Sequence, residues 1–189
     1  MTPNDRNPSR YKNKTFISVA VAALIAAGAG ADLILDQVLT EKEGVHLTAY
    51  QDGKGIWTIC KGLTRIYGRP VARNDRLTAD QCKHLDMEEQ ARSTTEVRAL
   101  VGDEVWSTLT PAAQAGLVSW CGINLGLAKC APSTAIRELR AGRRNEACAA
   151  ITMWIKDNGQ DCRIRSNGCL GQVTRRQLED ELCLIGAQS

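Results

Sequence analysis

Residues 43–58 read EGVHLTAYQDGKGIWT, and this stretch decides how we expect the chain to fold. The apolar residues before it follow helical spacing, so Glu43 is predicted to end a helix. The glycines beside Asp52 form a strong turn signal, and the β-branched and aromatic residues that follow are typical of a strand. We therefore expect Glu43, Asp52 at a hairpin turn and Thr58 on the returning strand to face one cleft.

Two carboxylates and a hydroxyl suit the cleavage of a glycosidic bond. One carboxylic acid must give a proton to the leaving oxygen, and a second carboxylate must stay ionised to activate water or stabilise the transition state. Here eight residues separate Glu43 from Asp52, and five separate Asp52 from Thr58. Spacing alone carries little weight, because most acid pairs at such a distance are solvated surface charges.

The residues around these positions resemble the phage-type lysozymes, or endolysins, of glycoside hydrolase family 24. That family carries a Glu, eight residues, Asp or Cys, five residues, Thr pattern. The neighbouring matches in this chain are Glu43-Gly44, Leu47, Ala49-Tyr50, Gly55, Trp57-Thr58-Ile59, Gly62 and Thr64. Downstream matches follow in the expected order: Asn124 and Gly126, Ser133-Thr134, Trp154, and Arg175-Arg176-x-x-Glu179. The resemblance covers residues 36 to about 185.

The resemblance implies a lysozyme-like α+β fold, mostly helical, with a small β-hairpin region and a larger helical lobe. It implies hydrolysis of the β-1,4 bond between N-acetylmuramic acid and N-acetylglucosamine in bacterial peptidoglycan, for host lysis. Glu43 would be the general acid, while Asp52 and Thr58 would position and activate water. Three further residues would bind substrate or support the cleft: Tyr50, Asn124 and Arg175.

The chain departs from the family pattern directly after the hairpin. Many relatives read Gly-Tyr-Gly-His after Thr-Ile, whereas this chain has Cys60-Lys61-Gly62-Leu63. The change removes one familiar cleft residue and leaves the three central positions intact. Two alternatives therefore stay open. One is an exported cell-wall-binding protein without catalysis, and the other is a lytic transglycosylase, which uses one catalytic Glu without an Asp partner.

The composition is that of a soluble globular protein, with 43% hydrophobic and 24% charged residues among 189. Residues 1–14 carry four basic side chains and one acidic one, which leaves 20 of each sign in the rest of the chain. This balance does not predict a nucleic-acid partner. We expect the glycan strands of peptidoglycan as the partner, no cofactor, and a monomer.

Eight cysteines, all beyond residue 59, predict disulfide bonds formed in an oxidising compartment. Their closest spacing is seven residues, which does not fit the close ligand pairs of a zinc site, so we expect no metal. Buried free thiols are the alternative. Eight cysteines allow 105 pairings, and the local candidates among them are Cys121–Cys130 and Cys162–Cys169.

The N-terminal segment, Thr15 to Ala31, has no charged residue and follows a basic stretch, as an export signal does. Nine of its 17 residues are Ala or Gly, so as an export helix it would be only marginally anchored. It could be a cleaved signal peptide, a permanent anchor, or a signal-arrest-release segment that leaves the membrane. The resemblance favours release, with residues 1–34 as this segment and residues 35–189 as the catalytic domain.

This segment is placed where it could control activity. Glu43 lies 12 residues past Ala31. While residues 15–31 tether the inactive enzyme at the host inner membrane, we expect residues 32–43 to be held there too, which would displace the general acid. Release into the periplasm would restore it, and the Ala/Gly face of the segment could then pack on the domain.

Capping signals divide the remaining sequence into helices. Thr78-x-x-Gln81 is a capping box that predicts a long polar helix to about Leu100. Thr110-Pro111 predicts a helix that runs to Asn124 and is stopped by Gly126. Further helices are expected from Ser133 or Thr134 to Gly142, from Asn145 to near Gly159, and from a second capping box, Thr174-x-x-Gln177.

The last of these helices would place two arginines in its first turn, where cations are unfavourable. Such a local cost suggests another use for Arg175 and Arg176. The resemblance implies that Arg175 pairs with the catalytic Glu. The alternative is a surface pair with Glu179.

Overall fold

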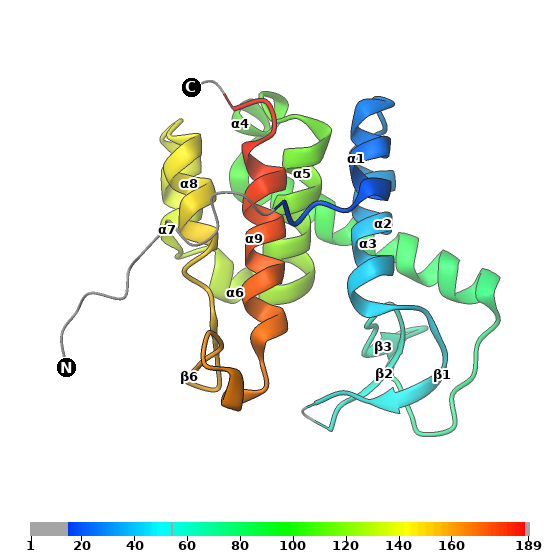
Figure 1. Cartoon of the computed structure of the whole chain (residues 1–189). Coiled ribbons are helices and arrows are strands. Elements are labelled where there is room, and N and C mark those ends of the chain that lie inside the picture. Colours follow the sequence, from blue (N-terminus) through cyan, green and yellow to red (C-terminus); the bar gives the residue numbers. More distant parts are fainter. Residues whose placement is uncertain (1–14, 54, 188–189) are drawn as a thin grey trace.

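The computed structural model describes residues 15–53 and 55–187. A helical lobe makes up most of the molecule, and a small region of antiparallel strands lies at one end of it (Figure 1). The helices are α1 (Val19–Ala26), α2 (Ala31–Glu43), α3 (Ala79–Val101), α4 (Asp103–Ser107), α5 (Pro111–Leu117), a π-helix (Val118–Leu125), α6 (Leu127–Cys130), α7 (Thr134–Arg140), α8 (Arg144–Ile151), a 3-10 turn (Arg165–Asn167) and α9 (Leu170–Leu184). The strands pair as β1 (His46–Gln51) with β2 (Trp57–Cys60), β3 (Arg65–Ile66) with β4 (Arg69–Pro70), and β5 (Lys156–Asp157) with β6 (Gln160–Asp161).

Strands β1 and β2 form the predicted hairpin. They run antiparallel, with Tyr50 opposite Thr58 and Gln51 opposite Trp57. A small apolar core, separate from that of the helical lobe, forms beside the hairpin because its inward side chains meet the start of α3. Its buried members are Ala49, Ile59, Cys60, Ile66, Val71, Cys82 and Leu85.

The long helix α3 joins this region to the helical lobe. The predicted capping box is confirmed: the Thr78 hydroxyl accepts from the Gln81 amide, and the Gln81 side chain accepts from the Thr78 amide. The first turns of α3 supply residues to the small core, whereas Val97 and Val101 near its end belong to the main core. Helix α3 therefore contributes to both cores and links the two regions.

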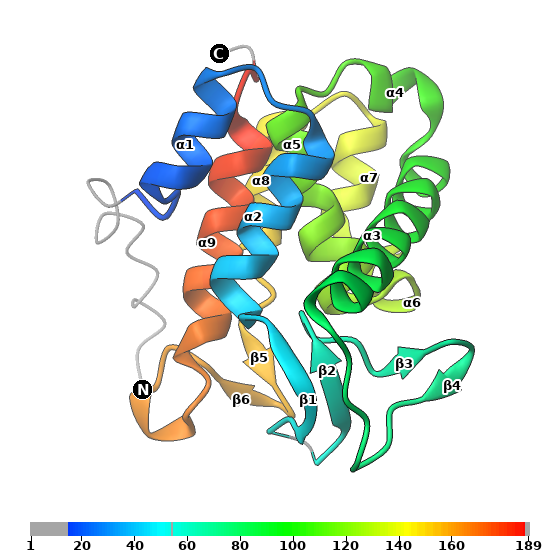
Figure 2. The same ribbon diagram turned by 90° about the vertical axis from the view of Figure 1, so that its right-hand side faces the viewer.

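The main core lies around α5, which packs against both α2 and α9 (Figure 2). Gly116 permits this close contact. A Cβ there would lie 2.9 Å from the Cβ of Leu182 and 3.0 Å from the carbonyl oxygen of Glu179. In the π-helix, a Cβ on Gly122 would lie 2.9 Å from the Cβ of Ser93 on α3. Both contacts are closer than side-chain carbons pack, so glycine sets the spacing.

The N-terminal segment folds as the short helix α1 and packs on the helical lobe. Val21 is fully buried in the main core. The Glu181 carboxylate of α9 accepts hydrogen bonds from the amides of Phe16 and Ile17, at 2.8 and 3.0 Å. Among the described residues, no helix has the length and apolar character needed to cross a membrane.

The packed face of α1 differs from the one we expected. Val21, Leu24 and Ile25 face the core, whereas Val19 and all four alanines of α1 are exposed. The expectation that the Ala/Gly face packs on the domain is therefore wrong, because larger side chains remove more apolar surface from water. Helix α2 runs from Ala31 straight through residues 34 and 35, where the sequence suggested a domain boundary.

The segment from Asn145 to Gly159 also differs from the prediction. Helix α8 begins at Arg144 without a side-chain cap, and it ends at Ile151 rather than near Gly159. Asn158 and Gly159 instead adopt positive φ angles, at 48° and 79°, and form the turn between β5 and β6. An Asn-Gly pair is a strong hairpin signal that the helical pattern before it obscured.

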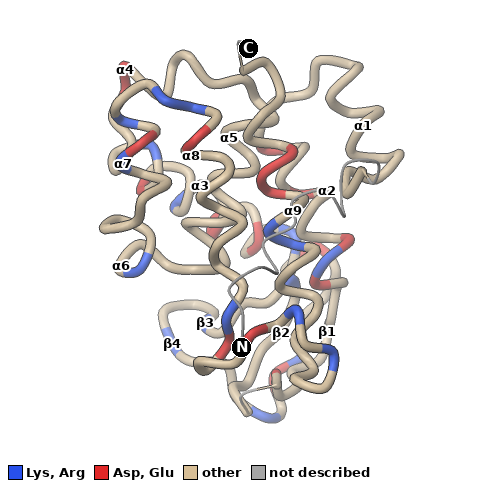
Figure 3. Tube along the Cα trace, turned by 60° about the vertical axis from the view of Figure 1, so that its left-hand side comes forward, with Lys and Arg blue, Asp and Glu red and all other residues tan. Residues whose placement is uncertain are grey.

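The cysteines form four disulfides, which confirms the predicted oxidation. Both predicted local pairs, Cys121–Cys130 and Cys162–Cys169, are present. The other two pairs are Cys60–Cys82 and Cys148–Cys183. Charged residues of both signs are spread over many elements, in keeping with the near-neutral domain (Figure 3).

Candidate active site

Glu43 is the last residue of α2, where the chain turns toward the hairpin. Its side chain is 27% exposed, so it is partly shielded yet within reach of solvent. The guanidinium of Arg175 donates a hydrogen bond from Nη1 to Glu43 Oε1. This contact joins the end of α2 to α9 across 132 residues of sequence.

Arg175 reaches Glu43 from within α9, and the predicted start of that helix is wrong. Helix α9 begins at Leu170, so Arg175 lies in its second turn. Thr174 does not cap it; its hydroxyl donates to the Gly171 carbonyl at 3.0 Å. The helix starts earlier because its first turn places Val173 in the interior. The argument from the helix dipole therefore does not apply, although the expected contact with Glu43 is present.

Glu179 holds Arg175 from the other side and was not among the predicted site residues. Its side chain is fully buried, and its Oε1 lies 3.6 Å from Arg175 Nε. Its Oε2 lies 3.1 Å from Arg176 Nε. Burial raises the pKa of Glu179, while both arginines and Ser119 act to lower it. The four-residue spacing from Arg175 to Glu179 on one helix face was the available signal.

Two side chains, those of Glu179 and Arg175, separate Asn124 from Glu43. At the end of the π-helix, its Nδ2 donates to the Ser119 carbonyl at 2.8 Å and to Glu179 Oε1 at 3.3 Å. The Ser119 hydroxyl donates to the same Glu179 oxygen at 2.8 Å. Asn124 thus supports Glu179, which contacts Arg175, which contacts Glu43.

Asp52 and Thr58 are both fixed by the backbone of Ile56. Asp52 Oδ1 accepts a hydrogen bond from the Ile56 amide at 2.8 Å. The Thr58 hydroxyl donates to the Ile56 carbonyl at 3.0 Å. Thr58 is almost fully buried. With its proton committed to Ile56, the Thr58 oxygen can only accept a further hydrogen bond, as from water.

Tyr50 links the two carboxylates electrostatically. Burial raises the pKa of Tyr50, and the negative charges of Glu43 and Asp52 raise it further. Both carboxylates therefore lie near enough to act on one phenol, which stays protonated and can donate. Its ring packs against that of His46, with centroids 4.4 Å apart. Tyr50 lies on β1 of the hairpin, where the charges of both carboxylates act on its phenol.

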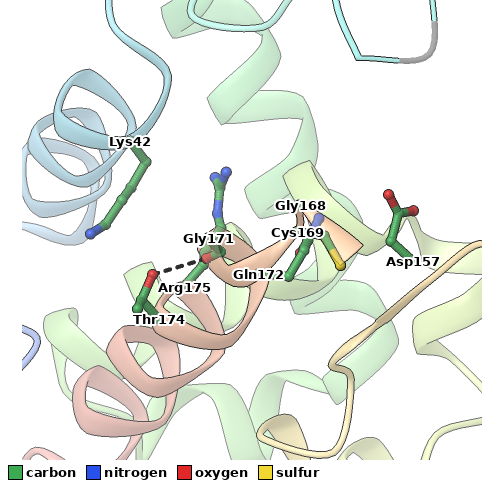
Figure 4. Close-up of a pocket in the computed structure, with 8 residues that line it drawn as sticks. All are labelled: Lys42, Asp157, Gly168, Cys169, Gly171, Gln172, Thr174 and Arg175. Carbon is green, nitrogen blue, oxygen red and sulfur yellow. Dashed lines mark hydrogen bonds between the residues drawn. The ribbon is translucent and has the colours of Figure 1, made fainter. Parts of the chain in front are cut away.

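A pocket of about 340 Å³ lies beside Arg175, between the end of α2 and the start of α9 (Figure 4). Lys42 lines it from α2, Asp157 from β5, and Cys169 from the position just before α9. The remaining lining residues are Gly168, Gly171, Gln172, Thr174 and Arg175. Glu43 follows Lys42 in the chain and contacts Arg175, so the pocket adjoins its carboxyl group, whereas Tyr50, Asp52 and Thr58 do not line it. The two carboxylates, the phenol and the fixed hydroxyl of the site can donate and accept protons.

Comparison with known families and relatives places these residues in context. Residues 40–179 match the family described as Phage lysozyme. The chain is 50% identical over 170 residues to a protein named SAR-endolysin from Escherichia phage 933W, covering 90% of this chain and 94% of that protein. It is 48% identical over 172 residues to a probable prophage lysozyme of Escherichia coli K12, covering 91% and 95%.

Solved structures show the same architecture. An endolysin from the Escherichia coli O157:H7 phage FAHEc1 aligns with a TM-score of 0.67 at 27% identity, over 82% of this chain and 92% of that one. A mutant of P22 lysozyme aligns with a TM-score of 0.63 at 28% identity, over 79% and 94%. The mostly helical α+β fold predicted from the sequence is confirmed.

Proposed function

The chain belongs to the phage lysozyme family, and from this premise we propose how its residues carry out the reaction. It is a host-lysis enzyme that hydrolyses peptidoglycan. The bond cleaved is the β-1,4 link between N-acetylmuramic acid and N-acetylglucosamine. Glu43 is the general acid, and Asp52 with Thr58 positions and activates the attacking water.

In the proposed reaction Glu43 loses a proton and Asp52 gains one. Glu43 gives its proton to the glycosidic oxygen as that bond breaks, and water adds to the sugar carbon. Asp52 takes the proton that the water loses, while the Thr58 oxygen accepts a hydrogen bond from the same water. Arg175 faces the carboxylate that forms on Glu43, so its charge stabilises the transition state more than the ground state.

The contact that carries this proposal is the one between Glu43 and Arg175. It fixes one carboxyl oxygen of the acid and leaves the carboxyl at the edge of the site, near Tyr50 and the hairpin. Asp52 belongs to the hairpin, so the acid and the water-activating group come from different regions. This second carboxylate favours hydrolysis over a lytic transglycosylase, which needs one acid alone.

A zymogram on purified peptidoglycan tests the assignment. Glu43→Gln should fold normally and lose lytic activity, because the amide cannot deliver a proton. Glu104→Gln, at an exposed position of α4, is the matched control and should stay active. An active Glu43→Gln protein would falsify the assignment. Reducing-end products are expected, and 1,6-anhydro products would indicate a transglycosylase instead.

We also propose that residues 15–31 tether the inactive enzyme at the inner membrane before release to the periplasm. Relatives at 48–50% identity are named SAR-endolysins, and the docked helix α1 supports the released state. Ser18 Oγ donates to Glu41 Oε1 at 2.7 Å, so α1 is joined to α2 as well as to α9. Displacing α1 would therefore disturb the helix that ends in Glu43.

Fractionation of lysing cells tests the tether. Ala22→Leu with Ala26→Leu raises the hydropathy of α1 at exposed positions without straining its backbone. We expect this variant to stay in the membrane fraction and to delay lysis. Ala22→Gln with Ala26→Gln should do the opposite. Equal fractionation of all three proteins would rule the tether out, and N-terminal sequencing of the soluble form separates release from cleavage.

A further inference from the structure

The turn after β2, residues 60–63, lies directly against Glu43. Ile59 and Leu63 close it by exchanging two backbone hydrogen bonds of 2.9 Å each. Gly62 has a φ of +95°, and a Cβ there would lie 3.9 Å from Glu43 Cδ and Oε2. This turn therefore forms one wall around the carboxyl group of the proposed general acid.

Two consecutive residues fasten the turn to α3. Cys60 is bonded to Cys82, and the Lys61 amide donates to Asp86 Oδ1 at 3.3 Å. Cys82 and Asp86 are four residues apart, so they lie on one face of α3. Asp86 is 3% exposed. Burial outweighs the lowering effect of the Lys61 amide and raises the pKa of Asp86 to about 6.

The Lys61 side chain reaches from the turn to α2. Its Nζ lies 2.5 Å from Asp36 Oδ1, and the lysine side chain is only 10% exposed. Gln90, one further turn along α3, donates to the same Asp36 oxygen at 3.0 Å. Although burial raises the pKa of Asp36, hydrogen bonds from Lys61 and Gln90 outweigh it and lower that pKa. The pair is therefore held in its charged form.

Asp36 and Glu43 are seven residues apart on α2, which places them on the same face two turns from each other. The turn lies along that face, because Lys61 contacts Asp36 and Gly62 lies beside Glu43. Lys61 is thus the residue through which α2, α3 and the hairpin are held together behind the acid. Its position falls in the segment where this chain departs from the family pattern.

We propose that Lys61 is a positioning residue for the reaction. Resting on the proposed function of Glu43, the proposal is that the Lys61–Asp36 ion pair sets the turn at residues 60–63 against the Glu43 carboxyl. This contact fixes the acid relative to Asp52 and Thr58 on the hairpin. Lys61 itself does not touch substrate, and its effect passes through the turn.

Steady-state kinetics of the full chain on solubilised glycan strands tests this role. Lys61→Met keeps the aliphatic stem and removes the charge, so kcat should fall about tenfold through misplacement of the acid, with KM within twofold of wild type. Lys61→Arg can still pair with Asp36 and should recover most of the kcat. Lys129→Met, at an exposed position of α6, is the matched control and should leave both constants unchanged.

Asp36→Asn provides the second arm, because it removes the same ion pair from the other side. It should lower kcat as Lys61→Met does, and the double variant should be no slower than either single one. Wild-type kcat in both folded single variants, or an equal rise in KM, would overturn the positioning role. Glu43→Gln run in parallel separates the two proposals, since its activity alone reports on the acid assignment.

Discussion

The two halves of the site are held in place by different means. Glu43 depends on side chains distant in sequence, with Arg175 contacting it and a fully buried Glu179 behind Arg175. Asp52 and Thr58 depend on the backbone of Ile56, within a single hairpin. The position of Glu43 is therefore sensitive to substitutions in the helical lobe. The positions of Asp52 and Thr58 depend on contacts within the hairpin.

The largest effect should come from a substitution in the buried cluster that holds Arg175 against Glu43. Glu179→Gln leaves Arg175 and Arg176 without a buried counter-charge, so the free energy of unfolding should fall by about 3 kcal/mol or more. Urea denaturation measures it. Glu89→Gln, which removes an exposed pair with Arg92, is the control and should cost under ~1 kcal/mol. Equal losses of unfolding free energy in both variants would show that the buried cluster stabilises the fold no more than an exposed ion pair does.

Arg175→Met tests the same half through activity instead of stability. Removing a charge that faces the forming carboxylate should lower kcat about 100-fold, with a smaller change in the unfolding midpoint. Arg175→Lys should recover only part of the rate, because an ammonium cannot reproduce the fork geometry of a guanidinium. A wild-type rate in Arg175→Met would mean that Glu43 is positioned without it.

The hairpin half should respond more weakly. Thr58→Val keeps the shape but removes the hydroxyl that binds the Ile56 carbonyl, so we expect about a tenfold loss of kcat. Thr58→Ser retains the hydroxyl and should stay within a few fold of wild type. Rates measured under the conditions used for Arg175→Met make the two halves comparable. A larger loss at Thr58 than at Arg175 would reverse the comparison.

The last prediction concerns how the free energy of unfolding depends on pH, and it uses one acid near the hairpin and one in the helical lobe. Burial raises the pKa of Asp86 and of Asp180 to about 6, from an ordinary value of 3.8. Their protons are retained on folding below that pH, so this stabilisation is present under about pH 4 and is lost as the pH rises through 6. Asp86→Asn and Asp180→Asn should each flatten the profile of unfolding free energy. Strongly non-additive losses in the double variant would show that the two regions are coupled.

Local signals predicted the hairpin well. The turn at Asp52, the strand that follows it, and the capping box at Thr78 all depend on contacts between residues close in sequence. The local pairs Cys121–Cys130 and Cys162–Cys169 belong to the same class. Sequence reasoning succeeds here because the interacting groups lie within one motif.

Long-range packing decided what the sequence did not predict. Thr174 resembles a cap, but burial of Val173 begins α9 a turn earlier. Glu179 resembled one member of a surface pair, but it is fully buried and accepts hydrogen bonds from Ser119 and Asn124 of the π-helix. The expected contact of Arg175 with the acid came from family resemblance, because no local pattern links residues 132 positions apart.

The two close helix contacts at Gly116 and Gly122 carry a consequence for how such enzymes can diverge. Each holds a helix at a spacing that any side chain would widen: α9 with Arg175 in one case, and α3 with the hairpin fastened to it in the other. A methyl group at either position would therefore shift an entire arm of the site. Sequence drift in this lineage should be tolerated more readily on the outer rim of the cleft than at these two interior positions, which no substrate ever reaches.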